Sequence, residues 1–476
     1  MGISSAGIGS GLDVNSIVSQ MVALEKRPIA QLQSSAASIQ TKLSTYSQVK
    51  SLMSTLSDAA AKLTRDSAWN GMSVTSTNSA AVSASVTGIA SATSFGISVQ
   101  QLARAQSVAS TAIATADAPV GAGTMTIQLG TWMHTAPPPN FVPGAAAAVD
   151  VTVGATDSLS TIAAKINDAK AGVTATVLRD ATGERLLVRS AATGEASGFR
   201  IQVAEDSGAP GLSQLSFDPK DAPGQGMAAN TVQYGLNTQA KLNGIDVSST
   251  DNTFANTIPG LKLTVSQVTT DEVNMTVGAD TAAMKKNVQD FVDAYNAVND
   301  LLSTSTKYDA ETKTAGVLQG DNTAVGLQNA LRMLTMGSAG GTGAFQRLAD
   351  VGITMERGGK LAVSGSKLDE ALKNPAGLKE LFATSATGGS GGGLAVQFKS
   401  FTSGLLSLDG LMNNKADALS AAAKRNTSEQ EKVNNRAAVV EKRLRAQYTA
   451  LDAKMGSLTA LNSYISQQVS AWNKTS

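Results

Sequence analysis

Apolar side chains recur every three or four residues at both ends of the chain, and this spacing predicts helices there. The N-terminal pattern runs from Leu32 to Ala60, and the C-terminal pattern runs from Val433 to Trp472. Such spacing lines one helical face with apolar side chains, which must pack against another helix. We therefore expect the two ends to meet each other or a partner. The predicted helical-seam contacts are Ile17, Met21, Leu24, Leu32, Ile39, Leu43, Val440, Leu444, Leu451, Leu458 and Ile465.

Between these ends, apolar residues alternate with Ser and Thr in short runs that predict half-buried strands. The first run begins near Met72, and the helical period returns at about Asp280. A helix is predicted over 158–170, with Asp157 as its capping candidate. Residues 207–230 are rich in Gly, Pro and Asp, which predicts a loop or an irregular excursion.

Three local signals mark boundaries. Asp13 is a candidate N-cap for a short amphipathic helix, and Pro28 should either break that helix at Arg27 or open the next one. Ala181-Thr182-Gly183 is a plausible hairpin turn between two predicted strands.

The order of elements predicts an α+β multidomain fold, in which terminal helices form a coiled-coil leg and a helical domain. Antiparallel β-rich head domains are inserted between them. The expected parts are a terminal coiled-coil leg (1–42 with 433–476), a helical domain (43–71 with 280–432), a β-rich head domain (72–122 with 236–279) and an outer inserted β/α head domain (123–235).

Composition narrows the classes of function. The chain has 38 Lys and Arg against 37 Asp and Glu, so it lacks the basic excess typical of nucleic-acid-binding proteins. No apolar run reaches the roughly 18 residues of a membrane span. The absence of cysteine is typical of a protein that never needed disulfides, and it also suits a protein exported unfolded through a narrow channel. The first residues lack the basic leader and apolar core of a cleaved secretory signal.

Candidate chemistry is sparse. His134 is the only histidine and precedes Pro137, Pro138 and Pro139, which predicts an exposed loop. No nucleophile elbow accompanies it, and the glycines at 7–11 follow no predicted strand, so they are not a dinucleotide-binding loop. The sequence therefore predicts no enzyme, no catalytic residue, no cofactor and no metal site.

Several segments resemble one family when taken together. They are Gly7 to Val18, Leu24 to Ile29, Ser158 to Asn167 with Gly172 to Ala175 and Gly183 to Arg189, and Leu242 to Ile245 with Ile258 to Leu261. In this order they are similar to the bacterial flagellar cap family (FliD, or flagellar hook-associated protein 2). The segment 158–189 resembles the repeat inserted in flagellins and hook-associated proteins. The insert from Trp132 to Pro143 and the run Ala145 to Ala148 lie outside that pattern, so a remodelled outer domain is expected.

The resemblance implies an oligomeric cap at the distal end of the flagellar filament, where exported flagellin folds and is inserted. The implied partners are further copies of the chain, flagellin, hook–filament junction proteins and an export chaperone on the C-terminal helix. It implies an extracellular location without a cleaved signal, and neither nucleic-acid binding nor membrane insertion.

A surface adhesin is the alternative interpretation. Exposed head domains with a loop bearing Trp132 and several prolines could bind mucin or glycans. A strain without a cap protein sheds unpolymerised flagellin, whereas a strain without an adhesin swims normally.

Overall fold

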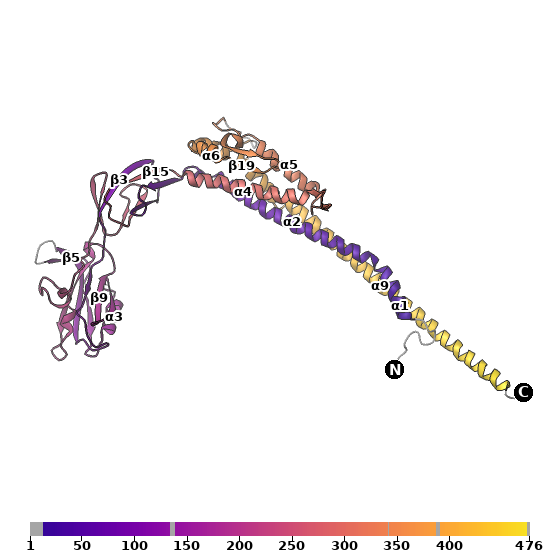
Figure 1. Ribbon diagram of the computed structural model, residues 1–476, viewed down its shortest axis with the longest axis horizontal. Helices are drawn as coiled ribbons and strands as arrows, with labels where there is room; N and C mark the ends of the chain where they lie inside the picture. The colour runs from indigo at the N-terminus through magenta and orange to yellow at the C-terminus, as the bar shows by residue number, and fades with distance from the viewer. Residues whose placement is uncertain (1–12, 134–138, 341, 387–390, 474–476) are drawn as a thin grey trace. The chain divides into compact units, whose positions relative to one another are not determined.

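The computed structural model describes residues 13–133, 139–340, 342–386 and 391–473 (Figure 1). The chain divides into two compact units. The helical unit combines Met1–Asn70 with Thr281–Ser476, and the β unit is Gly71–Asp280. The chain leaves the helical unit once and returns to it once, so the β unit is an insertion.

The helical unit is built from long helices at the two ends of the chain and shorter ones between them. Its helices are α1 (Val14–Glu25), α2 (Arg27–Leu63), α4 (Thr281–Thr306), α5 (Asn322–Met336), α6 (Gly365–Ala371), α7 (Pro375–Ala383), α8 (Leu394–Leu406) and α9 (Leu411–Trp472). Two short hairpins accompany them, namely β16 (Tyr308–Asp309) with β17 (Thr314–Ala315) and β18 (Ile353–Met355) with β19 (Leu361–Val363).

The first two helices begin where the sequence indicates. The Asp13 carboxylate accepts a hydrogen bond from the Ser16 backbone N–H at 3.0 Å, which confirms the N-cap of α1. Pro28 lies in the first turn of α2, where its missing N–H has no helical partner to lose. The chain therefore ends one helix and starts another within two residues.

The core of the helical unit lies where α2, α4 and α8 meet. Phe291 and Phe398 are fully buried and pack edge to face with ring centroids 5.1 Å apart. Trp69 stacks on Phe382 at 5.4 Å, and its indole N–H donates to the carbonyl of Leu63 at 2.8 Å. Trp69 follows the end of α2 by six residues, after the 3-10 turn η1 (Asp66–Ala68), so this bond fixes the end of that helix over the core.

The described part of the β unit contains four antiparallel sheets. A five-stranded sheet has the order β1 (Met72–Ser76), β15 (Val273–Ala279), β3 (Thr93–Gln101), β11 (Thr238–Leu242) and β12 (Ile245–Ser249). A three-stranded sheet has the order β13 (Thr253–Ala255), β14 (Leu261–Val265) and β2 (Val82–Val86). These two sheets enclose one apolar core, which contains Phe95, Ile97, Leu263 and Met275.

The other two sheets of the β unit enclose a second core with α3 (Leu159–Asp168). One sheet is formed by β10 (Gly198–Glu205), β5 (Gly123–Met133) and β6 (Asn140–Pro143), with β7 (Val149–Val153) also paired to β5. The other is formed by β4 (Ser107–Ala109), β9 (Gly183–Ser190) and β8 (Val173–Asp180). Asn167 of α3 exchanges two hydrogen bonds with the backbone of Ala175 at 2.8 and 2.9 Å, which ties the helix to β8.

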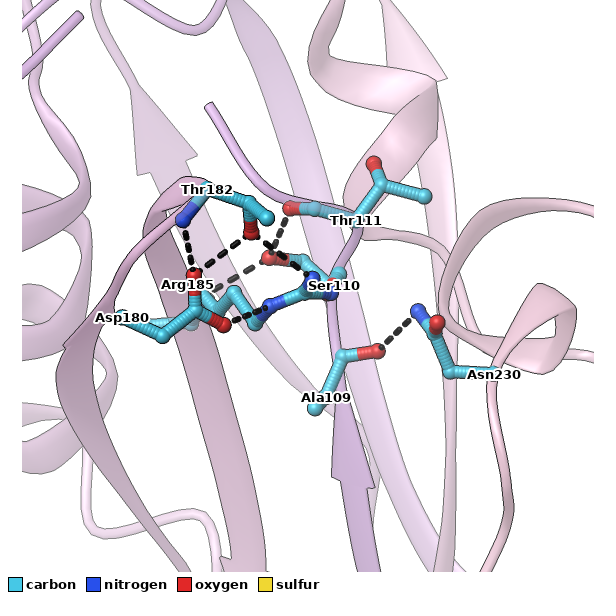
Figure 2. A network of polar contacts seen from close by, with 8 residues as sticks. Ala109, Ser110, Thr111, Asp180, Thr182, Arg185 and Asn230 are labelled. Carbon is cyan, nitrogen blue, oxygen red and sulfur yellow. Dashed lines mark hydrogen bonds and ion pairs between the residues drawn. The ribbon is translucent and has the colours of Figure 1, made fainter. Parts of the chain in front are cut away.

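The hairpin predicted at 181–183 is present, with Asp180 paired to Gly183 across a two-residue turn. Figure 2 shows how its polar groups converge on Asp180. The carboxylate accepts hydrogen bonds from the backbone and hydroxyl of Thr182 and from Arg185 at 2.8 Å. These bonds, those of Thr182 first, lower the pKa of Asp180. Arg185 also donates to the carbonyl of Ser110 at 3.2 Å, so the turn is joined to the segment after β4.

Two expectations about the β unit were wrong in detail. The N-cap of α3 is Ser158, whose hydroxyl accepts from Thr161, while Asp157 accepts hydrogen bonds from Gly154 and Lys165 instead. The segment 207–230 is irregular, as expected, and contains the 3-10 turns η3 (Leu212–Leu215) and η4 (Gly226–Ala229). Leu212, Leu215 and Met227 of these turns are fully buried.

Trp132 is the second of these corrections. It lies on β5 with only 4 % of its surface exposed, and it packs on Phe141 at 4.9 Å and Phe217 at 5.6 Å. Its indole N–H donates to the carbonyl of Phe199 at 2.8 Å. Trp132 is therefore part of the second core and not of an exposed loop. His134, Pro137 and Pro138 lie outside the described residues, and so do the glycines at 7–11.

Candidate assembly surface

The two ends of the chain lie together as an antiparallel helix pair, with α1 and the first half of α2 running along α9 (Figure 1). The polar contacts along the pair are Arg445 to Asn15 (3.1 Å), Arg436 to Glu25 (2.8 Å), Asn426 to the carbonyl of Leu32 (3.0 Å) and Lys50 to Asn413 (2.7 Å). The two residue numbers in each contact sum to about 460. A single register therefore holds over the whole length of the pair.

A small apolar cluster closes the far end of this pair. Val14, Val18 and Val22 of α1 are buried and pack on Ala437 of α9, which is also fully buried. Their spacing of four residues places them on one face of α1. The small side chain of Ala437 lets the two helices approach closely. Leu444 and Tyr448 are half-buried against the same cluster.

The predicted seam residues of α1 and α2 differ in exposure. Ile17 is half-buried, whereas Met21 and Leu24 are 43 % and 54 % exposed. Leu32, Ile39 and Leu43 are half-buried, as are Val440 and Leu444 on α9. The valines at 14, 18 and 22 make the intrachain contact instead, and their spacing of four was the signal for it. As contacts in an assembly, all the predicted residues stay predictions.

The last part of α9 presents an apolar face that no described residue covers. Leu451, Leu458 and Ile465, all predicted seam contacts, are 42 %, 58 % and 50 % exposed. Further exposed apolar residues on this part of the helix are Met455, Leu461, Tyr464 and Val469. These residues run from Leu451 to Val469, so this face is about 27 Å long at 1.5 Å per residue.

A partly buried polar cluster fastens the pair to the rest of the helical unit. Asp321, the N-cap of α5, accepts hydrogen bonds from the Tyr46 hydroxyl at 2.9 Å and from Lys415 at 2.8 Å. The Lys415 ammonium also lies 5.3 Å from the centre of the Tyr46 ring, a cation–π distance. This Tyr46–Asp321–Lys415 cluster therefore joins α2, α5 and α9.

The titration of this cluster follows from its burial. Burial and the bond to Asp321 both raise the pKa of the Tyr46 hydroxyl. Burial alone would raise the pKa of the Asp321 carboxyl, but the bonds from Lys415 and Tyr46 hold it below its usual value. Asp321 is therefore ionised and Tyr46 neutral at neutral pH.

Within the described ranges, no three His, Asp or Glu residues are grouped as metal ligands. Over the same residues, no helix combines the length and apolar character that crossing a bilayer requires. The candidate assembly surface is the terminal helix pair with its extension, because apolar side chains are exposed there.

Three family models match the chain. Residues 10–106 match the flagellar hook-associated protein 2 N-terminus, residues 235–460 match the C-terminus of the same family, and residues 140–192 match the flagellin hook IN motif. The chain is also 30 % identical to the flagellar hook-associated protein 2 of Escherichia coli K12, with 98 % of both chains covered. The chain belongs to the flagellar hook-associated protein 2 family. The resemblance noted from residues 7–261 is thereby confirmed.

Other relatives extend this assignment to the structure. The B-type flagellar hook-associated protein 2 of Pseudomonas aeruginosa is 28 % identical, over 96 % of this chain and 95 % of that one. The crystal structure of the D1-D2-D3 domains of the flagellar cap protein FliD from Escherichia coli superposes with a TM-score of 0.54 at 28 % identity, covering 79 % of this chain and 99 % of that chain. The predicted α+β class, with long terminal helices and antiparallel sheets between them, is confirmed.

Proposed function

We propose that this chain is a structural subunit of the cap at the distal end of the bacterial flagellum. In this role it promotes the folding and insertion of exported flagellin subunits and prevents their loss. The observation that carries the proposal is the match to the hook-associated protein 2 family over nearly the whole chain. The uncovered apolar face of α9 supports it, because an assembly factor needs a surface that a partner completes.

The proposed partners are further copies of the chain, flagellin, hook–filament junction proteins and an export chaperone on the C-terminal helix. The proposed location is the extracellular filament tip, reached without a cleaved signal peptide. The absence of cysteine is compatible with export as an unfolded chain. The role requires binding and positioning of other subunits, and it requires no catalysis.

We assign the four expected parts of the chain to this role. Residues 1–42 with 433–476 would form the leg, 43–71 with 280–432 the helical domain, and 72–122 with 236–279 the inner head domain. Residues 123–235 would form the outer head domain with the flagellin-type repeat. Support comes from the buried apolar clusters, since each of these parts contains most of one cluster. The adhesin alternative loses its main support, because Trp132 is buried.

A deletion strain tests the proposal directly. Without this protein, cells should lack normal filaments and should release flagellin monomer into the medium, and expression of the full chain should restore filament growth. Immunoblots of culture supernatants and electron microscopy of the cells provide the two measurements. Normal filaments with no released flagellin in the deletion strain would refute the cap role.

A further inference from the structure

Three side-chain amides bind the last strand of a sheet in the same way. In each case the carboxamide oxygen accepts from a backbone N–H, and the carboxamide nitrogen donates to the C=O of the same residue. With the distance from the backbone N–H given first, the pairs are Asn167 with Ala175 of β8 (2.8 and 2.9 Å), Gln106 with Phe199 of β10 (3.0 and 2.8 Å) and Asn296 with Leu361 of β19 (2.8 and 2.9 Å). Each of these strands stands at the end of its sheet. Because a carboxamide offers the donor and the acceptor of a peptide group, each one takes the place of a neighbouring strand.

The sheet of β4, β9 and β8 is covered differently at its two edges. At β4, Ser107 exchanges backbone hydrogen bonds with Gln233 at 2.8 and 3.0 Å, and Asn230 donates to the carbonyl of Ala109 at 3.1 Å (Figure 2). At β8, among the described residues, no backbone group beyond β9 binds the strand. Ala175 is buried there, but the Asn167 side chain that binds it belongs to an exposed residue of α3. The closure of this edge therefore depends on one surface side chain.

The strand behind Asn167 has the composition of a segment that pairs with copies of itself. Residues 173–178 read Val-Thr-Ala-Thr-Val-Leu, with no charge, no proline and no glycine. Six-residue segments of this kind associate as extended strands when their edge is open. Leu178 is already 48 % exposed, and the first charged residue along the strand is Arg179, which is paired with Glu184. Two copies of the segment would meet without like-charge repulsion.

We propose that Asn167 closes the edge of β8 and thereby prevents residues 173–178 from pairing with the same strand of a second copy. The association that it prevents would use a sheet edge and not the terminal helices. The inference goes beyond the cap role and does not depend on it, because it concerns how this sheet is kept from growing.

Hydrogen exchange of the full chain, measured by mass spectrometry, tests the closure. Asn167→Ala removes both bonds to Ala175, and we expect peptides covering 173–179 to exchange about tenfold faster. Asn167→Asp keeps the size of the side chain but replaces the donor to the C=O by a second acceptor, so exchange should also be faster. Asp168→Ala, at the exposed neighbouring position, is the control and should exchange as the natural chain does. Unchanged exchange in Asn167→Ala, with folding checked by circular dichroism, would overturn the closure.

Incubation of the purified full chain tests the pairing with a second copy. We expect Asn167→Ala to gain thioflavin T fluorescence and large species in light scattering, about fivefold above the natural chain. The natural chain provides the baseline, so association through other surfaces is subtracted. Asn167→Asp provides the same comparison should Asn167→Ala be unfolded.

Thr176→Lys, combined with Asn167→Ala, separates strand pairing from a general loss of stability. Thr176 is exposed, and a lysine there brings two positive charges close together when two copies of β8 pair. The lysine restores no bond to Ala175, so exchange should stay fast while association returns to the level of the natural chain. No excess association of folded Asn167→Ala, or an excess that Thr176→Lys leaves unchanged, would overturn the proposal.

Discussion

At the scale of single residues, the Tyr46–Asp321–Lys415 cluster is the most consequential polar contact of the helical unit. Asp321 caps α5 and at the same time neutralises Lys415 on α9 and accepts the Tyr46 hydroxyl from α2. Each partner comes from a different helix. One carboxylate therefore positions three elements, and its loss leaves a partly buried ammonium unpaired.

Asp321→Ala should destabilise the helical unit by about 2–4 kcal/mol, from the lost cap and the lost charged hydrogen bonds. Urea unfolding followed by circular dichroism measures the change. Asp417→Ala, an exposed aspartate on α9, is the matched control and should shift the transition little. A loss no larger for Asp321→Ala than for the control would show that the cluster is not structurally important.

The same cluster predicts a pH dependence. The pKa of Asp321 is lowered in the folded chain, so the stability it contributes is present above the unfolded value, near pH 4, and is lost as the pH falls through the folded value. The stability difference between the natural chain and Asp321→Asn should thus be constant near neutral pH and shrink in acid. A difference that grows on acidification would contradict the assigned ion pair.

At the scale of elements, the helical spacing of apolar residues at each end of the chain predicted the terminal helices. It did not predict which face of α1 is buried. Two stripes on α1 fit a helical period, Val14–Val18–Val22 and Ile17–Met21–Leu24, and the choice depends on Ala437, more than 400 residues away in the chain. Trp132 shows the same limit. The nearby prolines favour a loop, while its burial depends on Phe217, which lies far along the chain.

Val18→Asn tests the contact between α1 and α9. The substitution removes about 1.5–3 kcal/mol of apolar burial and places an amide against Ala437, so α1 should detach locally while the main core stays folded. Trypsin cleavage after Lys26, at the junction of α1 and α2, should become faster. Ser19→Asn, on the exposed face of the same helix, is the control and should leave the cleavage rate unchanged. Equal rates for the two variants would contradict the contact.

At the scale of the whole molecule, the order helix, strands, helix was predictable from the spacing of apolar residues. Their period changes from 3.6 residues to 2 and back again along the sequence. The pairing of strands was not, since β15 lies between β1 and β3 although about 200 residues separate β1 from β15. The burial of residues within 207–230 could not be predicted either, because the few apolar residues that are buried stand among Gly and Pro residues, which favour a loop.

The inserted β unit should fold alone. Its first and last strands, β1 and β15, are paired, and the Asp280 N–H donates to the carbonyl of Gly71 at 2.8 Å, so the two cut ends are adjacent. A fragment of residues 71–280 should give a cooperative thermal transition and a β-type circular dichroism spectrum. A fragment of residues 71–242, which lacks β15 between β1 and β3, is the control, and in it the five-stranded sheet should not form. Unfolded behaviour of the longer fragment would refute independence of the unit.

The apolar face of the terminal helices is the centre of this account, and one triple substitution tests it most directly. Leu444, Leu451 and Leu458, each changed to Asp in a complemented deletion strain, should abolish filament growth and release flagellin while the β unit stays folded. Ala446, Ala453 and Ala460 have the same spacing on the opposite, exposed face, and Asp at these positions is the control that should still support filaments. Filaments of normal length and number from the leucine variant, counted by electron microscopy, would contradict the account.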